Sequence, residues 1–237
     1  MENLTGGTPP VRYLPCVVPC KLYFTQDQIN RAMKTDPAQI GHHIEAGYVD
    51  GKIKPIDPSF KMIGPAYTVR CPSNDNSVIY YAMSQAPAGS VLVVDRLGEH
   101  RIACCGEISA LNAKTYGLAG ILVDGVVTDS TQIKEIGLPV FARGTASTAC
   151  SLKYKDGEFN IPVHCGGVVV NPGDIVFGNA DGVIVCPADE FETYLCQSEK
   201  DDQTEAEWKA GFAAGRHFDD LIPDLKEKVE ARLGIKK

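Results

Sequence analysis

The chain has few of the features that mark membrane, secreted or nucleic-acid-binding proteins. Residues 1–10 are polar where a secretory signal needs an apolar segment, and no run of about 18 apolar residues occurs. Lys and Arg total 23 against 30 Asp and Glu, which gives a formal net charge of −7, and they form no basic cluster. These absences predict a cytoplasmic protein without a membrane span and without a nucleic-acid partner.

Several signatures of metal and catalytic sites are also missing. The nine cysteines show no Cys-x-x-Cys spacing, and their odd number does not suit a disulfide framework, so reduced thiols are the simpler interpretation. The motifs GxxxxGK[ST], GxGxxG, HExxH and GxSxG do not occur. Adjacent His42 and His43 would point about 100° apart on a helix, which favours a solvated or interface face over a shared metal ion.

What the chain does contain is typical of a globular protein. It has 237 residues, of which 44% are hydrophobic and 22% charged. We expect an N-terminal extension at 1–24, one domain at 25–190 and a helical, acidic extension at 191–237. Three aromatic residues of this last segment have no evident partner within the chain: Trp208, Phe212 and Phe218. The C-terminal extension is therefore predicted to lie at a subunit interface.

The middle of the chain alternates short apolar runs with helical segments. The expected elements are a strand at 66–70, a helix at 77–85, a strand at 90–95, a helix from Gly106 to Gly117, a strand at 120–123, a helix at 131–136 and a strand at 139–142. This order predicts the α/β class, with a parallel sheet, β-α-β units and right-handed crossovers.

The flanking segments follow other patterns. Residues 25–46 are expected to run as one helical stretch, although their hydrophobic periodicity is weak. After Gly144 we expect a β-meander, because apolar runs at 167–170, 174–177 and 182–185 are separated by turn sequences. From Pro187 onward the chain is predicted to be helical.

Two loops carry candidate chemistry. Gly106 and Glu107 lie at a predicted helix start, and Asp124 and Asp129 follow the carboxyl end of a parallel strand, where open α/β sheets bind ligands. Backbone N–H groups at the helix start suit an anion, and Glu107 with Asp129 would suit a hard divalent cation. Equally, Asp129 could cap the helix beginning near Ser130, with Asp124 part of a simple turn.

The vicinal Cys104 and Cys105 allow two interpretations as well. They could be a reactive pair at a helix N-terminus, where the thiolate form is favoured. Vicinal thiols rarely form a disulfide, so small packing residues beside a close backbone approach are the preferred interpretation.

The wider sequence resembles the RraA-like family. The resemblance is carried by GEI at 106–108, GLAGILVDGVVTD at 117–129, GLPVFARG at 137–144, and the later IPV at 161–163, GGV at 166–168, NPGD at 171–174 and DGV at 181–183. It covers about residues 25–220. The family includes 4-hydroxy-4-methyl-2-oxoglutarate and 4-carboxy-4-hydroxy-2-oxoadipate aldolases, which also decarboxylate oxaloacetate, and the ribonuclease E regulator.

The resemblance implies an α/β/β fold in trimers or hexamers, with active sites between subunits and a Mg²⁺ or Mn²⁺ ion. It implies that Asp129 holds the metal and that Glu107 supports a water on it. Glu205 is the best match for an acid supplied by a neighbouring subunit. The substrate would be a small 2-oxo acid cleaved through an enolate. It would contact the glycine-loop segment, which is the loop that follows the strand at 90–95 and leads to Gly106, and side chains near it. The contacting residues would be Cys104, Cys105, Gly106, Glu107, Ile108, Thr128 and Arg143.

One position departs from the family pattern. The aldolases have Arg immediately before the metal-binding Asp, whereas this chain has Thr128, which cannot supply the positive charge. Arg101 or Arg143 could replace that charge, or Arg143 could be a surface or interface residue. Three hypotheses follow: a metal-dependent lyase, an enzyme with a diverged reaction on a less anionic substrate, and a non-catalytic regulator that binds a protein.

Overall fold

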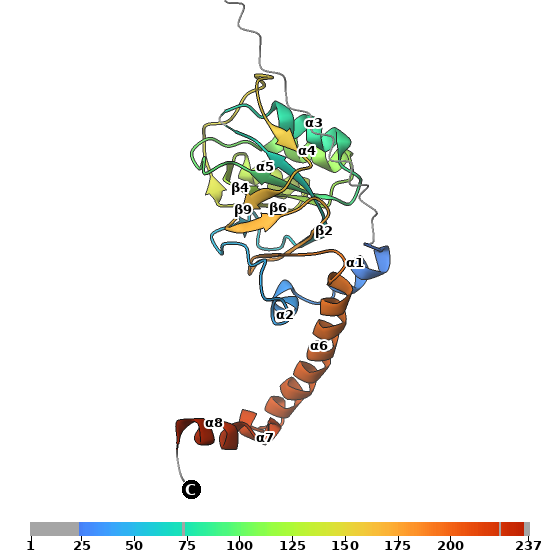
Figure 1. The fold of residues 1–237 in the computed structure, drawn as a ribbon, viewed down its shortest axis with the longest axis vertical. Helices are drawn as coiled ribbons and strands as arrows, with labels where there is room; N and C mark the ends of the chain where they lie inside the picture. The colour runs from blue at the N-terminus through green and yellow to red at the C-terminus, as the bar shows by residue number, and fades with distance from the viewer. Residues whose placement is uncertain (1–23, 73, 223, 235–237) are drawn as a thin grey trace, which may run out of the picture.

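A mixed eight-stranded sheet forms the centre of the computed structural model, which describes residues 24–72, 74–222 and 224–234. The predicted N-terminal extension lies outside the described residues except for Phe24. Along the sheet the order is β1-β6-β4-β3-β2-β11-β12, and β8 also pairs with β2 (Figure 1). The strands are β1 (Lys54–Pro55), β2 (Met62–Arg70), β3 (Val91–Asp95), β4 (Gly120–Asp124), β6 (Val140–Ala142), β8 (Glu158–Phe159), β11 (Ile175–Gly178) and β12 (Val183–Cys186).

The parallel half of the sheet confirms the predicted α/β class. Strands β2, β3, β4 and β6 pair in parallel, and the chain between them forms α3 (Ser77–Gln85), α4 (Glu107–Thr115) and α5 (Ser130–Ile136). All five residues of β3 are buried, as expected for a strand covered on both faces. Gly117 and Gly137 follow α4 and α5 with φ near +72°, which ends each helix as predicted.

Strand β2 begins four residues earlier than the apolar pattern indicates. Its first half, from Met62 to Pro65, pairs antiparallel with β11, and its second half, from Ala66 on, pairs parallel with β3. Gly64 and Pro65 hide the start in the sequence, because both residues are rare inside strands. The pairing partner that makes this segment a strand comes more than 100 residues later in the chain.

A hairpin of β9 (Val163–Cys165) and β10 (Val168–Val170) forms a third layer. Strand β9 contacts β2, β3 and β4, on the face of the sheet away from α3 and α4 (Figure 1). The β-rich segment after Gly144 is therefore present but divided: β10 pairs with β9, while β11 and β12 extend the main sheet. A short parallel pair, β5 (Val126–Val127) with β7 (Gly144–Thr145), lies beside the main sheet's carboxyl edge.

The first helical stretch is broken into α1 (Gln26–Ala32) and α2 (Pro37–Gly41). The expectation of one helix over 25–46 was wrong because Asp36 precedes a proline and is extended, at φ −114° and ψ 152°. Both helices pack on the start of α6 (Phe191–Ala213), forming a small second core around Phe191 and Leu195. His43, beyond the end of α2, lies 2.6 Å from Asp201 of α6.

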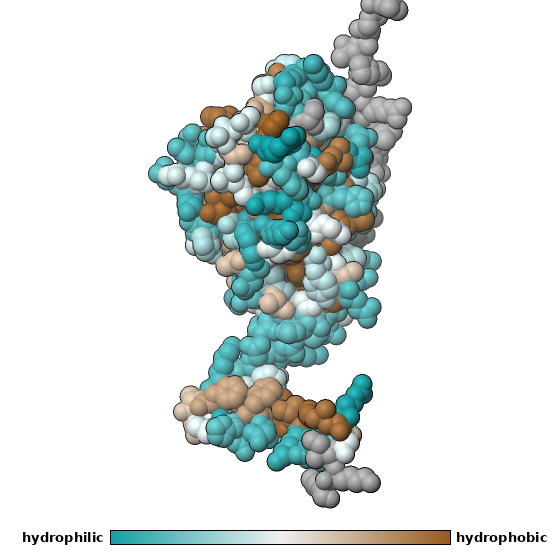
Figure 2. All heavy atoms as spheres, turned by 90° about the vertical axis from the view of Figure 1, so that its left-hand side faces the viewer, coloured by the Kyte–Doolittle hydropathy of each residue, from teal (hydrophilic) through white to brown (hydrophobic). Residues whose placement is uncertain are grey.

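The rest of α6 extends away from the body and leads to α7 (Phe218–Leu221) and α8 (Leu225–Leu233) (Figure 1). Contrary to the sequence-based expectation, the aromatic residues there contact one another. The Phe218 ring lies 5.2 Å from Trp208 and 6.1 Å from Phe212. Figure 2 nevertheless shows a hydrophobic band across this part of the molecule. No helix in the described part of the chain is both long and apolar enough to span a membrane.

Candidate active site at the start of α4

The two loops singled out in the sequence meet at the start of α4. The backbone N–H of Glu107 donates to Asp129 Oδ2 at 2.9 Å, and that of Thr128 donates to Cys105 O at 2.9 Å. The Thr128 hydroxyl lies 3.1 Å from Asp129 Oδ1. The Asp129 carboxylate therefore sits at the positive end of the α4 dipole, next to the residue that carries the second carboxylate.

Asp129 reaches this position through an unusual backbone conformation. It occupies the N-cap position of α5 in the left-handed region, at φ 57° and ψ 42°, and its side chain makes no capping bond to α5. The alternative that Asp129 caps the helix beginning near Ser130 is thus wrong, because its carboxylate faces α4 instead. Left-handed non-glycine residues are strained and gather at functional sites.

Gly106 makes the close approach of the two loops possible. A Cβ atom at this position would lie 2.4 Å from Asp129 Oδ2 and 2.6 Å from Thr128 Cγ2, both too short for a real contact. The N–H of Gly106 donates to the Ser109 hydroxyl at 2.6 Å, which stabilises the first turn of α4. Only glycine leaves room for the Asp129 carboxylate at this helix start.

Asp124 and Arg143 belong to an ion-pair network. The Arg143 guanidinium donates to Asp124 through Nε and to Asp50 Oδ2 through Nη1 at 2.6 Å, and Asp124 Oδ2 accepts from the Gly166 N–H at 2.7 Å. The Arg143 side chain is only 16% exposed. Burial lowers its pKa, but bonds to the two carboxylates outweigh this and raise it. Asp124 is thus more than a turn residue, and Arg143 has its charge compensated within the chain.

Arg101 is in a different situation. Its side chain is 86% exposed and pairs with Glu99, with Nη2 3.0 Å from Oε2. The hydrogen bond from Arg101 lowers the pKa of Glu99 to about 2. Because the Arg101 side chain itself is exposed, it can change partner without unfolding its surroundings.

Glu205 is not brought to the other two acids within one chain. It lies on α6, accepts a hydrogen bond from Gln39 at 2.6 Å and pairs with Lys209 at 3.0 Å. Figure 1 places α6 at the opposite end of the molecule from α4. Within the described residues no three His, Cys, Asp or Glu side chains are grouped to hold a metal. A contribution of Glu205 from a neighbouring subunit stays a prediction.

The vicinal cysteines take part through their backbone. Both thiols are buried in the main core, with the two Sγ atoms 3.9 Å apart and not bonded as a disulfide. The contact with Cys105 and burial raise the pKa of Cys104, so this thiol is protonated at neutral pH. The carbonyl of Cys104 accepts from Asn76 Nδ2 at 3.2 Å. This arrangement favours packing over thiolate chemistry.

Sequence reasoning missed the wall on the other side of this loop. Asn76 and Tyr80, at the start of α3, lie behind the segment that carries Cys104 and Glu107, and they line a cavity there. No motif marks them, because a single Asn and a single Tyr near a helix start are common in any protein. Only the packing of α3 against α4 brings them to the site.

Comparison with known proteins identifies the family. The model described as RraA-like, Aldolase/RraA, matches residues 37–185. The chain belongs to the RraA-like family. The match ends just before α6, so the projecting helices lie outside the family region.

Two relatives of this RraA-like protein have names that point to different roles. It is 40% identical to a Halalkalibacterium halodurans protein named "Putative 4-hydroxy-4-methyl-2-oxoglutarate aldolase". The 148 aligned residues cover 62% of this chain and 70% of that protein. It is similar to the Streptomyces coelicolor structure RraAS2, described as an unusual member of the RNase ES inhibitor RraA family, at 26% identity and a TM-score of 0.69, over 78% of this chain and 96% of that one. The first relative supports a lyase.

Proposed function

We propose that this RraA-like protein is a divalent-metal-dependent carbon–carbon lyase that cleaves a small 2-oxo acid to release pyruvate. The observation that carries the proposal is the contact between Asp129 Oδ2 and the Glu107 N–H, which puts two carboxylate residues together at one helix start. A turn or a helix cap at this place would not require Glu107 as a second carboxylate beside Asp129. The similarity to a relative named as an aldolase supports the same reaction class.

The donor set fits Mg²⁺ or Mn²⁺. Asp129 is exposed, Glu107 is half-buried, and neither carboxylate is paired with a cation among the described ion pairs. Carboxylate oxygens, a hydroxyl and open space for waters are what these hard cations prefer. Asp129 would hold the ion, and Glu107 would support a water beside it. Bound there, the metal would act as a Lewis acid on the 2-oxo group.

The chain's own residues would orient the metal ligand, take up a proton and stabilise negative charge. The N–H of Glu107 holds Asp129 in one orientation, and the Thr128 hydroxyl sits beside its second oxygen. Glu107 is the group we assign to taking up the proton that the substrate's 4-hydroxyl loses, directly or through one water. The first turn of α4 favours the negative charge that builds up as the enolate of pyruvate forms.

Arg101 is the cation we assign to the substrate carboxylate. Thr128 cannot supply a charge, and Arg143 is already neutralised by Asp50 and Asp124. Arg101 is exposed on the same glycine-loop segment, and its side-chain bonds within the described part of the chain go to Glu99. In this role Arg101 acts on substrate binding, so its removal raises KM more than it lowers kcat.

The test is a pyruvate-release assay over a panel of 2-oxo acids with and without Mg²⁺ or Mn²⁺. We expect metal-dependent release by the parent protein, loss of that activity in Asp129→Asn, and a Mn²⁺ affinity lowered in the same variant when measured by calorimetry. Asp189→Asn removes an exposed carboxylate between β12 and α6 and serves as the matched control. No release from any acid in the panel, or unchanged Mn²⁺ affinity in Asp129→Asn, would refute the assignment.

A further inference from the structure

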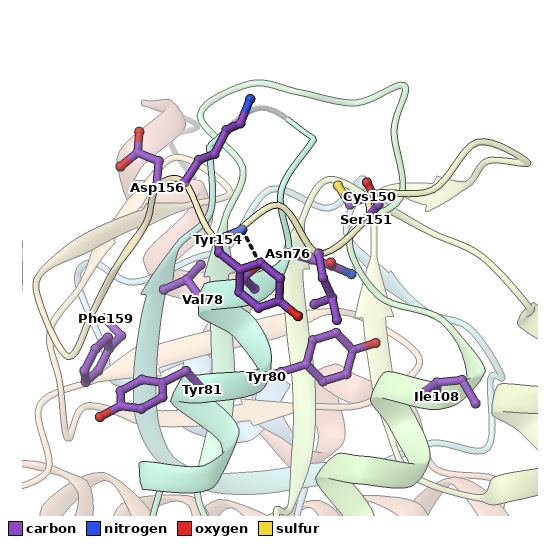
Figure 3. A pocket seen from close by; sticks show the side chains of 13 residues that line it. Asn76, Val78, Tyr80, Tyr81, Ile108, Cys150, Ser151, Tyr154, Asp156 and Phe159 are labelled. Atoms are coloured by element: carbon purple, nitrogen blue, oxygen red, sulfur yellow. Dashed lines mark hydrogen bonds between the residues drawn. The ribbon is translucent and has the colours of Figure 1, made fainter. Parts of the chain in front are cut away.

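A cavity of about 870 Å³ lies between α3 and the loop at 150–159. Figure 3 shows Tyr81 and Phe159 at one side, Tyr80 and Ile108 at the other, and the ring of Tyr154 between them. Its volume is within the range of small-molecule sites, which are mostly apolar with a few placed polar groups. Seven lining residues are aliphatic or aromatic: Val78, Tyr80, Tyr81, Ile108, Leu152, Tyr154 and Phe159.

The walls of this cavity are fixed by hydrogen bonds. Asp75, which is buried, accepts from the Lys155 N–H through Oδ2 at 2.7 Å, and the Ser77 hydroxyl accepts from the Tyr154 N–H at 2.9 Å. The Tyr81 and Phe159 rings pack edge to face with centroids 5.4 Å apart. The cavity is therefore preformed, so a ligand would not have to order the loop when it binds.

The cavity and the candidate active site share one wall. Asn76 lines the cavity and donates through Nδ2 to Cys104 O at 3.2 Å, in the segment whose next residues bind Thr128 and Asp129. Ile108 lines the cavity and directly follows Glu107 on α4. A small molecule whose reacting carbons lie at Glu107 would have its far end within reach of the cavity.

The side chain of Asn76, a lining residue, has one oxygen for which the described residues supply no partner. Asn76 is only 9% exposed, and nothing among the described residues donates to its Oδ1. The Nδ2 bond to Cys104 O fixes the amide, and Oδ1 is enclosed by protein atoms on the side away from that bond's donor. A buried acceptor without a partner costs stability, so such an atom calls for an explanation.

The charges around the cavity indicate what kind of group it takes. Of its lining residues, Lys155 and Asp156 are charged, and their signs are opposite. In the neighbouring loop, the uncharged Thr128 stands where the aldolases of the family have a positively charged Arg. A second carboxylate would find no net positive charge here, whereas an uncharged ring would be surrounded by apolar and aromatic side chains.

We infer that this cavity holds an aromatic ring carried on carbon 4 of the substrate, so that the substrate class is 4-aryl-4-hydroxy-2-oxo acids. The inference rests on the proposed lyase function. In the reaction, the bond between C3 and C4 breaks and its electron pair stays on C3. The 4-hydroxyl loses its proton as the C4 carbonyl forms, and C3 gains a proton. The products are pyruvate and an aromatic aldehyde, and no oxidant or reductant is needed.

Binding can be tested separately from catalysis. The probe is 4-phenyl-2-oxobutanoate, which lacks the 4-hydroxyl and cannot be cleaved, compared with 2-oxobutanoate, which lacks the ring. We expect Tyr81→Ala to weaken calorimetric binding of the phenyl probe by about 10-fold while binding of 2-oxobutanoate is unchanged. Tyr116→Ala is the matched control, because Tyr116 is 43% exposed but lies at the other end of α4, away from the lining residues.

Activity assays distinguish the ring site from the lyase function. We expect cleavage of 4-hydroxy-4-phenyl-2-oxobutanoate with a higher kcat/KM than 4-hydroxy-2-oxopentanoate, and Tyr81→Ala should remove that preference. If neither acid yields pyruvate but phenyl binding depends on Tyr81, the cavity stands as the ring site and the lyase assignment falls.

Two results would overturn the cavity assignment itself. One is pyruvate release from the aliphatic acid with no effect of Tyr81→Ala on either probe or on the preference. The other is a lower molar mass of Tyr81→Ala by light scattering, which would mean that a second copy of the chain covers this face.

Discussion

Gly106 and Asp129 depend on each other at the start of α4. The Asp129 carboxylate occupies the space in which any side chain at position 106 would lie, and the strained backbone of Asp129 aims it there. A well-placed metal ligand needs this kind of fixed orientation, since small displacements of reacting groups cost large factors in rate. The position of the Asp129 carboxylate thus requires both the glycine at 106 and the left-handed backbone at 129.

Gly106→Ala should therefore displace Asp129 and reduce activity more than stability. We expect kcat/KM for metal-dependent pyruvate release to fall by about 100-fold or more, because the new methyl group pushes the carboxylate off the Glu107 N–H. Steady-state kinetics and thermal unfolding measure the two effects. Gly51→Ala is the control, since nothing lies within 4 Å of a Cβ there. A fully active Gly106→Ala enzyme would show that Asp129 is not held where the chemistry occurs.

At the scale of elements, one buried carboxylate joins α3 to the loop at 151–155. Asp75 Oδ1 accepts from the Ser77 N–H at 3.0 Å and the Lys153 N–H at 3.1 Å, while Oδ2 accepts from Lys155. Burial raises the Asp75 pKa, but the bonds from Ser77 and from these backbone groups outweigh it, and the pKa is lowered overall. The Asp75 carboxylate and the Ser77 hydroxyl, which accepts from the Tyr154 N–H, together hold the loop that borders the cavity.

Asp75→Asn should destabilise the protein by about 2 kcal/mol or more, because an amide group cannot accept all of these bonds and introduces a donor among donors. The free energy of unfolding in urea measures the change. Asp57→Asn is a matched control, since Asp57 makes the same local bonds to Ser59 on a more exposed turn. Equal losses in the two variants would contradict the anchoring role of Asp75.

The pH dependence has a definite sign. Because the folded-state pKa of Asp75 is lowered, its stabilising contribution is complete above the unfolded carboxyl pKa of about 3.9. It is lost as the pH falls from there toward the folded-state value. The stability difference between the parent and Asp75→Asn should therefore be constant near neutral pH and shrink below about pH 4.

The molecule as a whole is divided between a compact body and a projecting helical arm made of the distal half of α6 with α7 and α8. The ring of Phe218 packs on Trp208 and Phe212, yet Phe212 and Phe218 stay 47% and 41% exposed. On α8, Val229 and Leu233 are exposed as well. Exposed apolar surface of this extent is typical of an interface with another chain.

We predict a homo-oligomer of three or six subunits in which the arm contacts another copy. Light scattering should give three or six times the chain mass of 25.5 kDa. Val229→Asp should lower the mass, because it places a charge in the apolar face of α8, whereas Ala231→Asp adds the same charge elsewhere on that helix and should not. A parent protein that runs as a monomer at micromolar concentration would contradict the prediction.

The α/β core was readable from local patterns. The helix expected at 77–85 is α3, the buried strand expected at 90–95 is β3, and Gly117 and Gly137 end their helices as predicted. Each of these signals lies within a few residues, because helix periodicity, strand apolarity and glycine caps are local properties. Signals that depended on distant pairing failed, as at the start of β2 and in the division of the β-rich segment.

The same division applies to the site. The sequence by itself determined that Glu107 and Asp129 would lie at the carboxyl edge of a parallel sheet, since strand order and helix starts are encoded locally. Only the tertiary structure decided that the Asp129 side chain turns to α4 rather than α5. It also decided that Arg143 is paired with Asp50 and Asp124, and that Asn76 lines a cavity next to the segment carrying Glu107. Side-chain direction and charge compensation depend on which elements pack together, and that packing is a property of the whole chain.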